Sequence, residues 1–160
     1  MKRLFTYTGI LALGVFLLVS CAKEAKPYDN PFIYITDENG AASSTVDSRM
    51  DVERSYTVYI STKRINRDIN VDFEITTGDG LTRGVDFDYI TDPGQPLNFV
   101  NGLYERNIRI RLMPRLVEEG KDNAIKISLT GNSENFTVGM PGPDKLFSSY
   151  IIRKVNVEDD

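Results

Sequence analysis

Apolar and polar residues alternate with a period of two along most of the chain after Pro31. The clearest run is 69–76, where Ile69, Val71, Phe73 and Ile75 are separated by polar residues. Because successive side chains of a strand point to opposite faces, this alternation is typical of a strand with one buried face. Three further runs have the same pattern, with predicted inward residues Tyr56, Val58 and Ile60; Ile108, Ile110 and Leu112; and Ile125, Ile127 and Leu129.

Shorter runs of strand-forming residues, separated by Gly, Pro, Asn and Asp, fill the rest of this region. They span 32–36, 86–90, 97–100, 136–138 and 149–157, and in the last run Arg153 shares a face with Ile151, Val155 and Val157. Residues 41–48 predict a loop, the Asn101-Gly102 pair predicts a tight turn, and 116–122 is the one stretch that suits a helical turn. About seven to eight short strands at roughly ten-residue spacing predict an all-β fold, an antiparallel β-sandwich of Ig-like build over residues 31–160.

The first twenty residues follow a different pattern. Two basic residues, Lys2 and Arg3, precede an apolar run from Ile10 to Val19, which is about half the ~20 residues that a membrane-spanning helix needs. This pattern predicts a secretory signal peptide. The residues Leu18-Val19-Ser20-Cys21 that end it resemble the lipobox of bacterial lipoproteins, and the resemblance implies cleavage between Ser20 and Cys21 and acylation of the Cys21 thiol. The alternative is an incidental cysteine, either a small buried side chain or a free thiol.

The predicted organisation is therefore a signal peptide over 1–20, an acylated Cys21 with a flexible tether over 21–30, and a β-sandwich domain over 31–160. The tether is polar, and Pro27 and Pro31 disfavour a helix there. Acylation implies a cell-envelope protein held in the lipid bilayer of the outer membrane by more than one acyl chain. Only Glu24 provides an acidic signal after the cysteine, so the surface and periplasmic faces both stay open.

Composition narrows the function. Removing residues 1–20 takes away two basic residues and leaves 17 Lys and Arg against 23 Asp and Glu, a net charge of −6. This charge argues against nucleic acid as a partner, because polyanion binding depends on Lys and Arg. The chain has no His and one Cys, so neither a Ser-His-Asp triad nor a zinc site with His or Cys ligands can form. Carboxylates, Lys and Tyr remain as catalytic parts, so a glycan hydrolase that uses a pair of carboxylates is a third alternative. We expect a protein that is not an enzyme and has no obligate cofactor.

The parts from about Met50 onward resemble, in order, the Calx-beta module, an Ig-like sandwich. The matching pieces are Asp51 and Glu53, Gly84-Val85-Asp86-Phe87, Leu97-Asn98-Phe99, Ile108-Arg109-Ile110-Arg111-Leu112, Glu118-Glu119, Ile125-Lys126-Ile127-Ser128-Leu129 and Val157-Glu158-Asp159-Asp160. Some Calx-beta modules bind Ca²⁺ in the loops at one end of the sandwich. The ion takes six to eight oxygen ligands. The resemblance implies Ca²⁺ ligands at Glu53 (or Asp51), Asp86, Glu119 with Glu118, Asp159 and Asp160.

Two observations oppose that site. Calcium-binding members place acidic residues after the Ile strand, where this chain has Met113-Pro114-Arg115. The carboxylates also fit solvated loop residues and a frayed C-terminus. The sequence offers two other candidate surfaces. The first is a set of tyrosines that could stack on sugar rings or serve as packing partners: Tyr34, Tyr59, Tyr89 and Tyr104. The second is a set of arginines that could hold an acidic partner or form a solvated strand face: Arg106, Arg109 and Arg111.

Together these features are similar to the small lipoproteins of Bacteroidota-type glycan-uptake systems. The expected function is a non-catalytic, lipid-tethered Ig-like module that binds a protein or a glycan in the cell envelope, as an accessory to glycan uptake. The alternative expectation is a Ca²⁺-binding module of the Calx-beta type.

Overall fold

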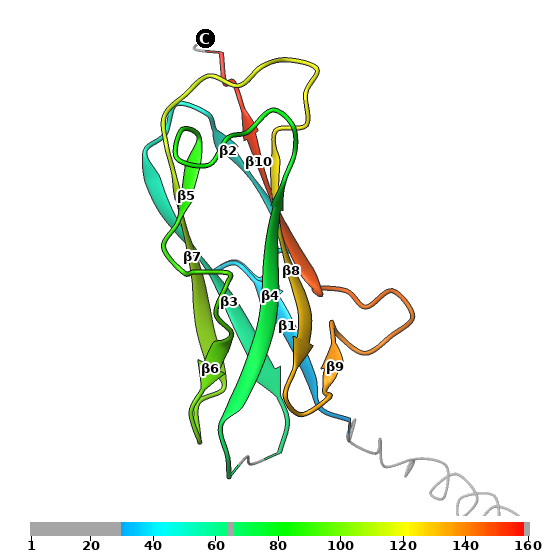
Figure 1. Ribbon diagram of the computed structural model, residues 1–160. Coiled ribbons are helices and arrows are strands. Elements are labelled where there is room, and N and C mark those ends of the chain that lie inside the picture. Colours follow the sequence, from blue (N-terminus) through cyan, green and yellow to red (C-terminus); the bar gives the residue numbers. More distant parts are fainter. Residues whose placement is uncertain (1–29, 64–65, 159–160) are drawn as a thin grey trace, which may run out of the picture.

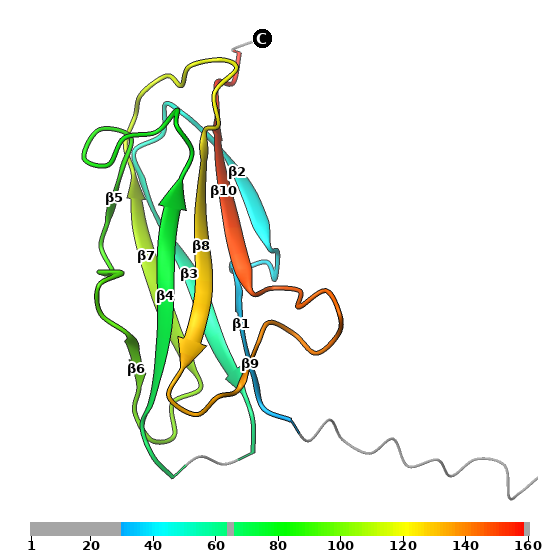
Figure 2. The ribbon, with the colours of Figure 1, turned by 45° about the vertical axis from the view of Figure 1, so that its right-hand side comes forward.

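The chain folds as an all-β sandwich of two five-stranded sheets (Figures 1 and 2). The computed structural model describes residues 30–63 and 66–158, so the predicted signal peptide, Cys21 and nearly all of the tether lie outside the described residues. Within those ranges every regular element is a strand. The same residues therefore contain no helix long and apolar enough to span a membrane. The described chain begins at one end of the sandwich and ends at the opposite one (Figures 1 and 2).

The first sheet has the strand order β5-β7-β3-β1-β9. Its neighbours pair antiparallel except β1 and β9, which are parallel. The strands are β1 (Phe32–Thr36), β3 (Val52–Ser61), β5 (Phe87–Tyr89), β7 (Glu105–Leu112) and β9 (Thr137–Val138).

The second sheet has the order β2-β10-β8-β4-β6. Here β10 and β2 pair parallel and the other neighbours pair antiparallel. The strands are β2 (Ser43–Asp47), β4 (Ile69–Thr77), β6 (Leu97–Phe99), β8 (Ala124–Asn132) and β10 (Ser149–Val155).

The core between the sheets is made by the residues that alternation predicts. All three inward residues of each of the β3, β7 and β8 runs are buried, and in β4 only Ile75 stays partly exposed. Burying side chains of this size stabilises a fold by about 1.5–3 kcal/mol each. The Asn101-Gly102 turn is also confirmed, since the Leu103 N–H donates to the Val100 carbonyl at 2.9 Å and Gly102 has φ +85°.

Three expectations need correction. The described residues form ten strands rather than seven to eight, and the sheets are mixed rather than wholly antiparallel. Residues 43–47 form β2 instead of a loop, because its parallel pairing with β10 supplies the order that its small polar residues do not signal. The 116–122 stretch is not helical: Val117 is buried there, and its N–H and C=O both bond to the Asn156 side chain.

The predicted face of β10 is off by one residue. Tyr150, Ile152 and Lys154 point into the core, whereas Arg153 is exposed and Ile151 and Val155 are half-buried. Because the third inward residue, Lys154, is charged, the sequence of β10 does not show the apolar alternation that would identify its buried face. The Lys154 Nζ donates to the Met113 carbonyl at 2.8 Å, so the charge is hydrogen-bonded while the methylene chain fills the core.

Candidate functional site

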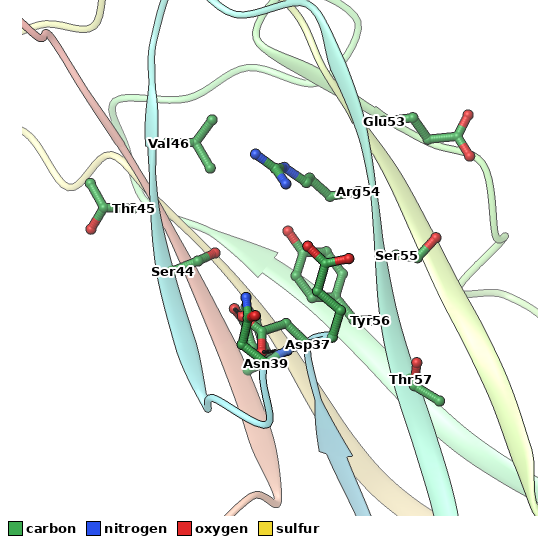
Figure 3. A pocket seen from close by; sticks show the side chains of 12 residues that line it. Asp37, Asn39, Ser44, Thr45, Val46, Glu53, Arg54, Ser55, Tyr56 and Thr57 are labelled. Carbon is green, nitrogen blue, oxygen red and sulfur yellow. Dashed lines mark hydrogen bonds between the residues drawn. The ribbon is translucent and has the colours of Figure 1, made fainter.

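A polar groove of about 430 Å³ opens between β2 and β3, on the side of the sandwich where β1 ends (Figure 3). Its lining comes from the turn after β1, the middle of β2, the first half of β3 and Tyr150 of β10. Figure 3 shows Arg54 and Val46 reaching toward each other across the gap, whereas Glu53 and Ser55 point away from it. The groove is thus bounded by one strand from each sheet.

The short length of β1 creates the opening. β1 pairs with β3 only over residues 57–61, and the chain then crosses to the second sheet as β2. A turn at residues 37–40 makes this crossing. Asp37 Oδ1 accepts from the N–H groups of Asn39 and Ala41 at 2.9 and 2.8 Å, and Gly40 has φ +74°, which glycine adopts without strain.

A polar cluster lies at the inner end of the groove. Arg54 occupies the inward column of β3, two residues before buried Tyr56. The Tyr56 and Tyr150 rings lie 4.5 Å apart between centroids and are tilted by 42°. The Tyr150 hydroxyl donates to Asp37 Oδ2 at 2.9 Å. An arginine and two tyrosine hydroxyls therefore stand where the fold otherwise buries apolar side chains.

The charge states of this cluster follow from burial and hydrogen bonding. Burial raises the pKa of Tyr150 to about 12, and burial raises the pKa of Tyr56 as well. Burial also pushes the pKa of Asp37 upward, but hydrogen bonds from Ala41, Tyr150 and Asn39 outweigh it and hold that pKa below its usual value. At neutral pH the groove thus combines two protonated phenols, a carboxylate and the Arg54 guanidinium.

Two buried atoms of the cluster have unused hydrogen-bonding capacity. Tyr56 is only 2% exposed, and neither its hydroxyl nor Arg54 Nε makes a well-formed hydrogen bond within the described residues. The Ser44 hydroxyl lies near the Tyr56 phenol and counteracts part of the rise in its pKa. A buried polar group without a partner costs about 1–3 kcal/mol. Arg54 as a whole is half-buried and lines the groove, so a group that enters the groove meets the uncovered part of its guanidinium, while Nε and the Tyr56 hydroxyl stay covered.

The predicted Ca²⁺ ligands that lie among the described residues do not form a group that could hold a metal ion. Glu53 lies on the outer face of the first sheet and forms an ion pair with Arg109. Glu119 is exposed in the segment between β7 and β8, and the neighbouring Glu118 pairs with Lys121. Asp159 and Asp160 lie outside the described residues. Within residues 30–63 and 66–158, no group of three or more Asp, Glu, His or Cys could hold a metal ion.

Asp86 is 1% exposed, and its carboxylate is used in contacts that stabilise the fold. Its Oδ2 accepts from the Thr82 N–H at 2.8 Å and from Arg115 at 3.1 Å, so the arginine that departs from the Calx-beta pattern is its ion partner. The preceding Gly84 has φ +81°, and its N–H bonds to the Phe87 carbonyl at 2.8 Å. The Gly84-Val85-Asp86-Phe87 motif therefore closes the turn into β5.

The same end of the sandwich holds the buried Lys154. Its Nζ donates to the backbone carbonyl of Asp86 at 3.2 Å in addition to that of Met113. Burial lowers the pKa of Lys154, and the Asp86 carboxylate partly offsets this. Ser48, also fully buried, donates to Asn156 at 2.8 Å. These contacts connect β10 to the loops around it.

The tyrosine and arginine candidates are engaged within the sandwich. Tyr34 and Tyr59 stack at 5.1 Å on the outer face of the first sheet. Tyr89 contacts Phe87 and Arg83, Arg109 pairs with Glu53 and Arg111 pairs with Asp51. Arg106 donates to the carbonyl of Asn98 in β6 of the second sheet. Tyr104 accepts at its backbone carbonyl from the Ile60 N–H.

Sequence reasoning missed the groove and its central residue. Arg54 is in phase with Tyr56, Val58 and Ile60, so extending that alternation backward by two residues would have placed an arginine on the buried face. Nothing in the sequence indicates that β1 stops short of it.

A scan of protein-family models found no match to this chain, and a search of curated proteins found no similar sequence.

Proposed function

We propose that this protein is a non-catalytic module of the cell envelope, tethered to the outer membrane through acylated Cys21, that holds a protein or glycan partner in the groove between β2 and β3. It acts as an accessory to glycan uptake. The observation that carries the proposal is the polar inner end of the groove, where Arg54 lines the opening and neither its Nε nor the Tyr56 hydroxyl makes a well-formed hydrogen bond among residues 30–63 and 66–158. Natural cores rarely retain such groups without a use, because each one lowers stability.

The architecture supports an Ig-like relationship. In Ig-like sandwiches one sheet contains strands A, B, E and D and the other contains C, F and G. The order β1-β3-β7-β5 corresponds to A-B-E-D, and β4-β8-β10 corresponds to C-F-G. Domains of this architecture use a rigid β framework to present binding surfaces. A binding role also agrees with the composition, because the chain has no histidine to act as a base and only one cysteine.

Replacing Cys21 with Ala tests the tether. We expect the variant to move from the membrane fraction to the soluble fraction and to lose incorporation of labelled palmitate, with an unchanged melting temperature because the cysteine precedes the sandwich. Persistence of the variant in membranes would overturn the anchor.

A photo-crosslinking residue placed at exposed Asn39 tests the groove in whole cells. We expect a discrete cross-linked product that is lost when Arg54→Met is added and is absent when the crosslinker stands at exposed Asp72 on β4. Equal products from both positions would contradict a role for the groove.

A further inference from the structure

The first half of β3 is an unpaired sheet edge facing the groove. β7 pairs with β3 over residues 52–59, but β1 covers the other side only over 57–61. Residues 52–56 therefore have no neighbouring strand on the β1 side within the described ranges. On the far side of the groove, β2 is the outermost strand of the second sheet.

The register determines which backbone groups face the opening. In an antiparallel ladder, alternate residues exchange hydrogen bonds with the neighbouring strand, and the residues between them point their N–H and C=O to the opposite side. The Ile60 N–H bonds to the Tyr104 carbonyl on the β7 side at 2.9 Å, so the even-numbered residues of β3 face β7. The backbone groups of Glu53 and Ser55 consequently point toward the groove.

An independent pair of contacts supports this assignment. In β1, the Ile33 carbonyl accepts from Gly139 and the Ile35 N–H donates to Phe147, so both residues face away from β3. The remaining residues of β1 then face β3, and Thr36 lies opposite Thr57. Thr57 is in phase with Glu53 and Ser55, so the odd-numbered residues of β3 face the β1 side.

We propose that the groove accepts an extended segment of a partner protein, which pairs antiparallel with Glu53 and Ser55 as a continuation of the line of β1. This inference rests on the proposed function and specifies its partner as a peptide strand. Two residues that each offer an N–H and a C=O can form four ladder hydrogen bonds, each worth about 0.5–1.5 kcal/mol. Strand addition at an exposed sheet edge is a general mode of peptide recognition.

The side chain opposite Arg54 decides specificity. Cross-strand neighbours share a face, so the partner residue opposite Arg54 points inward and lies about 4.5 Å away between Cα atoms, as in a non-hydrogen-bonded pair. Arg54 has no ion pair within the described residues. Asp37 already accepts from three donors, and Glu53 pairs with Arg109 on the outer face. The partner residue at this position is therefore acidic.

The first measurement tests the free edge. In hydrogen exchange on the acylated full-length protein in detergent, the Glu53 and Ser55 amides should exchange fast, whereas those of Arg54 and Tyr56, bonded to β7, should exchange slowly. Slow exchange of all four amides would overturn the proposal, because the edge would then be occupied already.

The second measurement uses a phage-displayed library of ten-residue peptides selected on the same acylated protein. Selected peptides should share one Asp or Glu and should slow exchange of the Glu53 and Ser55 amides at least tenfold. Two synthetic versions of the peptide are N-methylated, one at its odd-numbered residues and one at its even-numbered residues. The version that loses the N–H groups facing β3 should bind at least tenfold more weakly, and the other should bind almost as well as the unmodified peptide. Peptides whose binding does not depend on which set of residues is methylated, or a library that yields no binder, would overturn the strand mode.

Variants then separate the acidic contact from folding. A matched peptide carries Gln in place of the selected Asp or Glu. Arg54→Met should weaken binding of the acidic peptide about tenfold and remove the preference for it over the Gln peptide, whereas Arg153→Met on the exposed face of β10 should not. Protection of the Tyr56 amide reports that each variant is folded. If the Asn39 cross-link captures a glycan instead of a protein, the strand inference fails while the proposed binding function stands.

Discussion

Among the residues that the structure describes, Lys154 and Arg54 are cations at inward positions, and their surroundings differ. Lys154 is 2% exposed and donates to two backbone carbonyls, those of Asp86 and Met113. Arg54 Nε is covered from solvent but has no such acceptor among the described residues. The lysine therefore completes a polar network inside the protein, whereas the arginine retains hydrogen-bonding capacity for a group from outside.

Matched methionine substitutions test this contrast. Arg54→Met should raise the free energy of unfolding by about 1 kcal/mol, because it removes a buried donor without leaving a protein acceptor unpaired. Lys154→Met should lower it by about 2 kcal/mol, because the Met113 carbonyl loses the Nζ donor and the Asp86 carbonyl keeps only the Met113 N–H. Urea denaturation measures both, and a loss of stability in Arg54→Met comparable with that in Lys154→Met would refute the assignment of Arg54 as a binding residue.

At the scale of the elements, the sequence predicted every described strand except β2, including the short edge strands β5, β6 and β9. β4, β7 and β8 alternate strictly, and burial of one face selects one register, because a slip of one residue would expose every apolar side chain. β2 has one buried residue, Val46, so alternation provides almost no signal for it. Its pairing depends on β10, which lies far away in the sequence.

A charge inside a long strand should abolish folding. Ile110 is fully buried at the centre of β7, and Ile110→Asp both removes about 1.5–3 kcal/mol of apolar burial and places an unpaired carboxylate in the core. Against a typical total stability of about 5–15 kcal/mol, we expect an unfolded chain by circular dichroism. Asp72→Asn on the exposed face of β4 is the control and should change stability by less than about 0.5 kcal/mol. A folded Ile110→Asp variant would contradict the core assignment.

At the scale of the whole molecule, exposed carboxylate–arginine pairs along the first sheet make the stability depend on pH. Hydrogen bonds from Arg111 and Arg83 lower the pKa of Asp51 and Asp88, respectively. A carboxylate whose pKa is lower in the folded than in the unfolded state stabilises the fold above its unfolded pKa, near 3.9, and loses that contribution as the pH falls through the folded value.

The unfolding free energy should therefore decrease below about pH 4. The double variant Asp51→Asn, Asp88→Asn should decrease less steeply between pH 4 and 2, as measured by urea titrations at each pH. Parallel slopes for the variant and the parent would show that these pairs contribute nothing to the pH dependence.

Calcium should leave the stability of the whole domain unchanged. A bound ion at a hundredfold excess over its Kd would add about 2.7 kcal/mol, or several degrees of melting temperature. Glu53 and Asp86 are each held by an arginine, so we expect the same melting temperature in chelator and in millimolar Ca²⁺. A rise of several degrees would instead support the Ca²⁺ site that the Calx-beta resemblance implies, with Asp159 and Asp160 as further ligands.

The sequence by itself determined the all-β class and the inward residues of β3, β7 and β8, because alternation and turn residues are local signals that each strand carries independently. It also predicted the lipid tether at Cys21. Only the tertiary structure decided that β1 stops at Thr36, that β2 joins the other sheet, and that Arg54 lies beside the resulting groove. Those features depend on pairing between segments distant in the chain, and no local pattern records which sheet edge is left open.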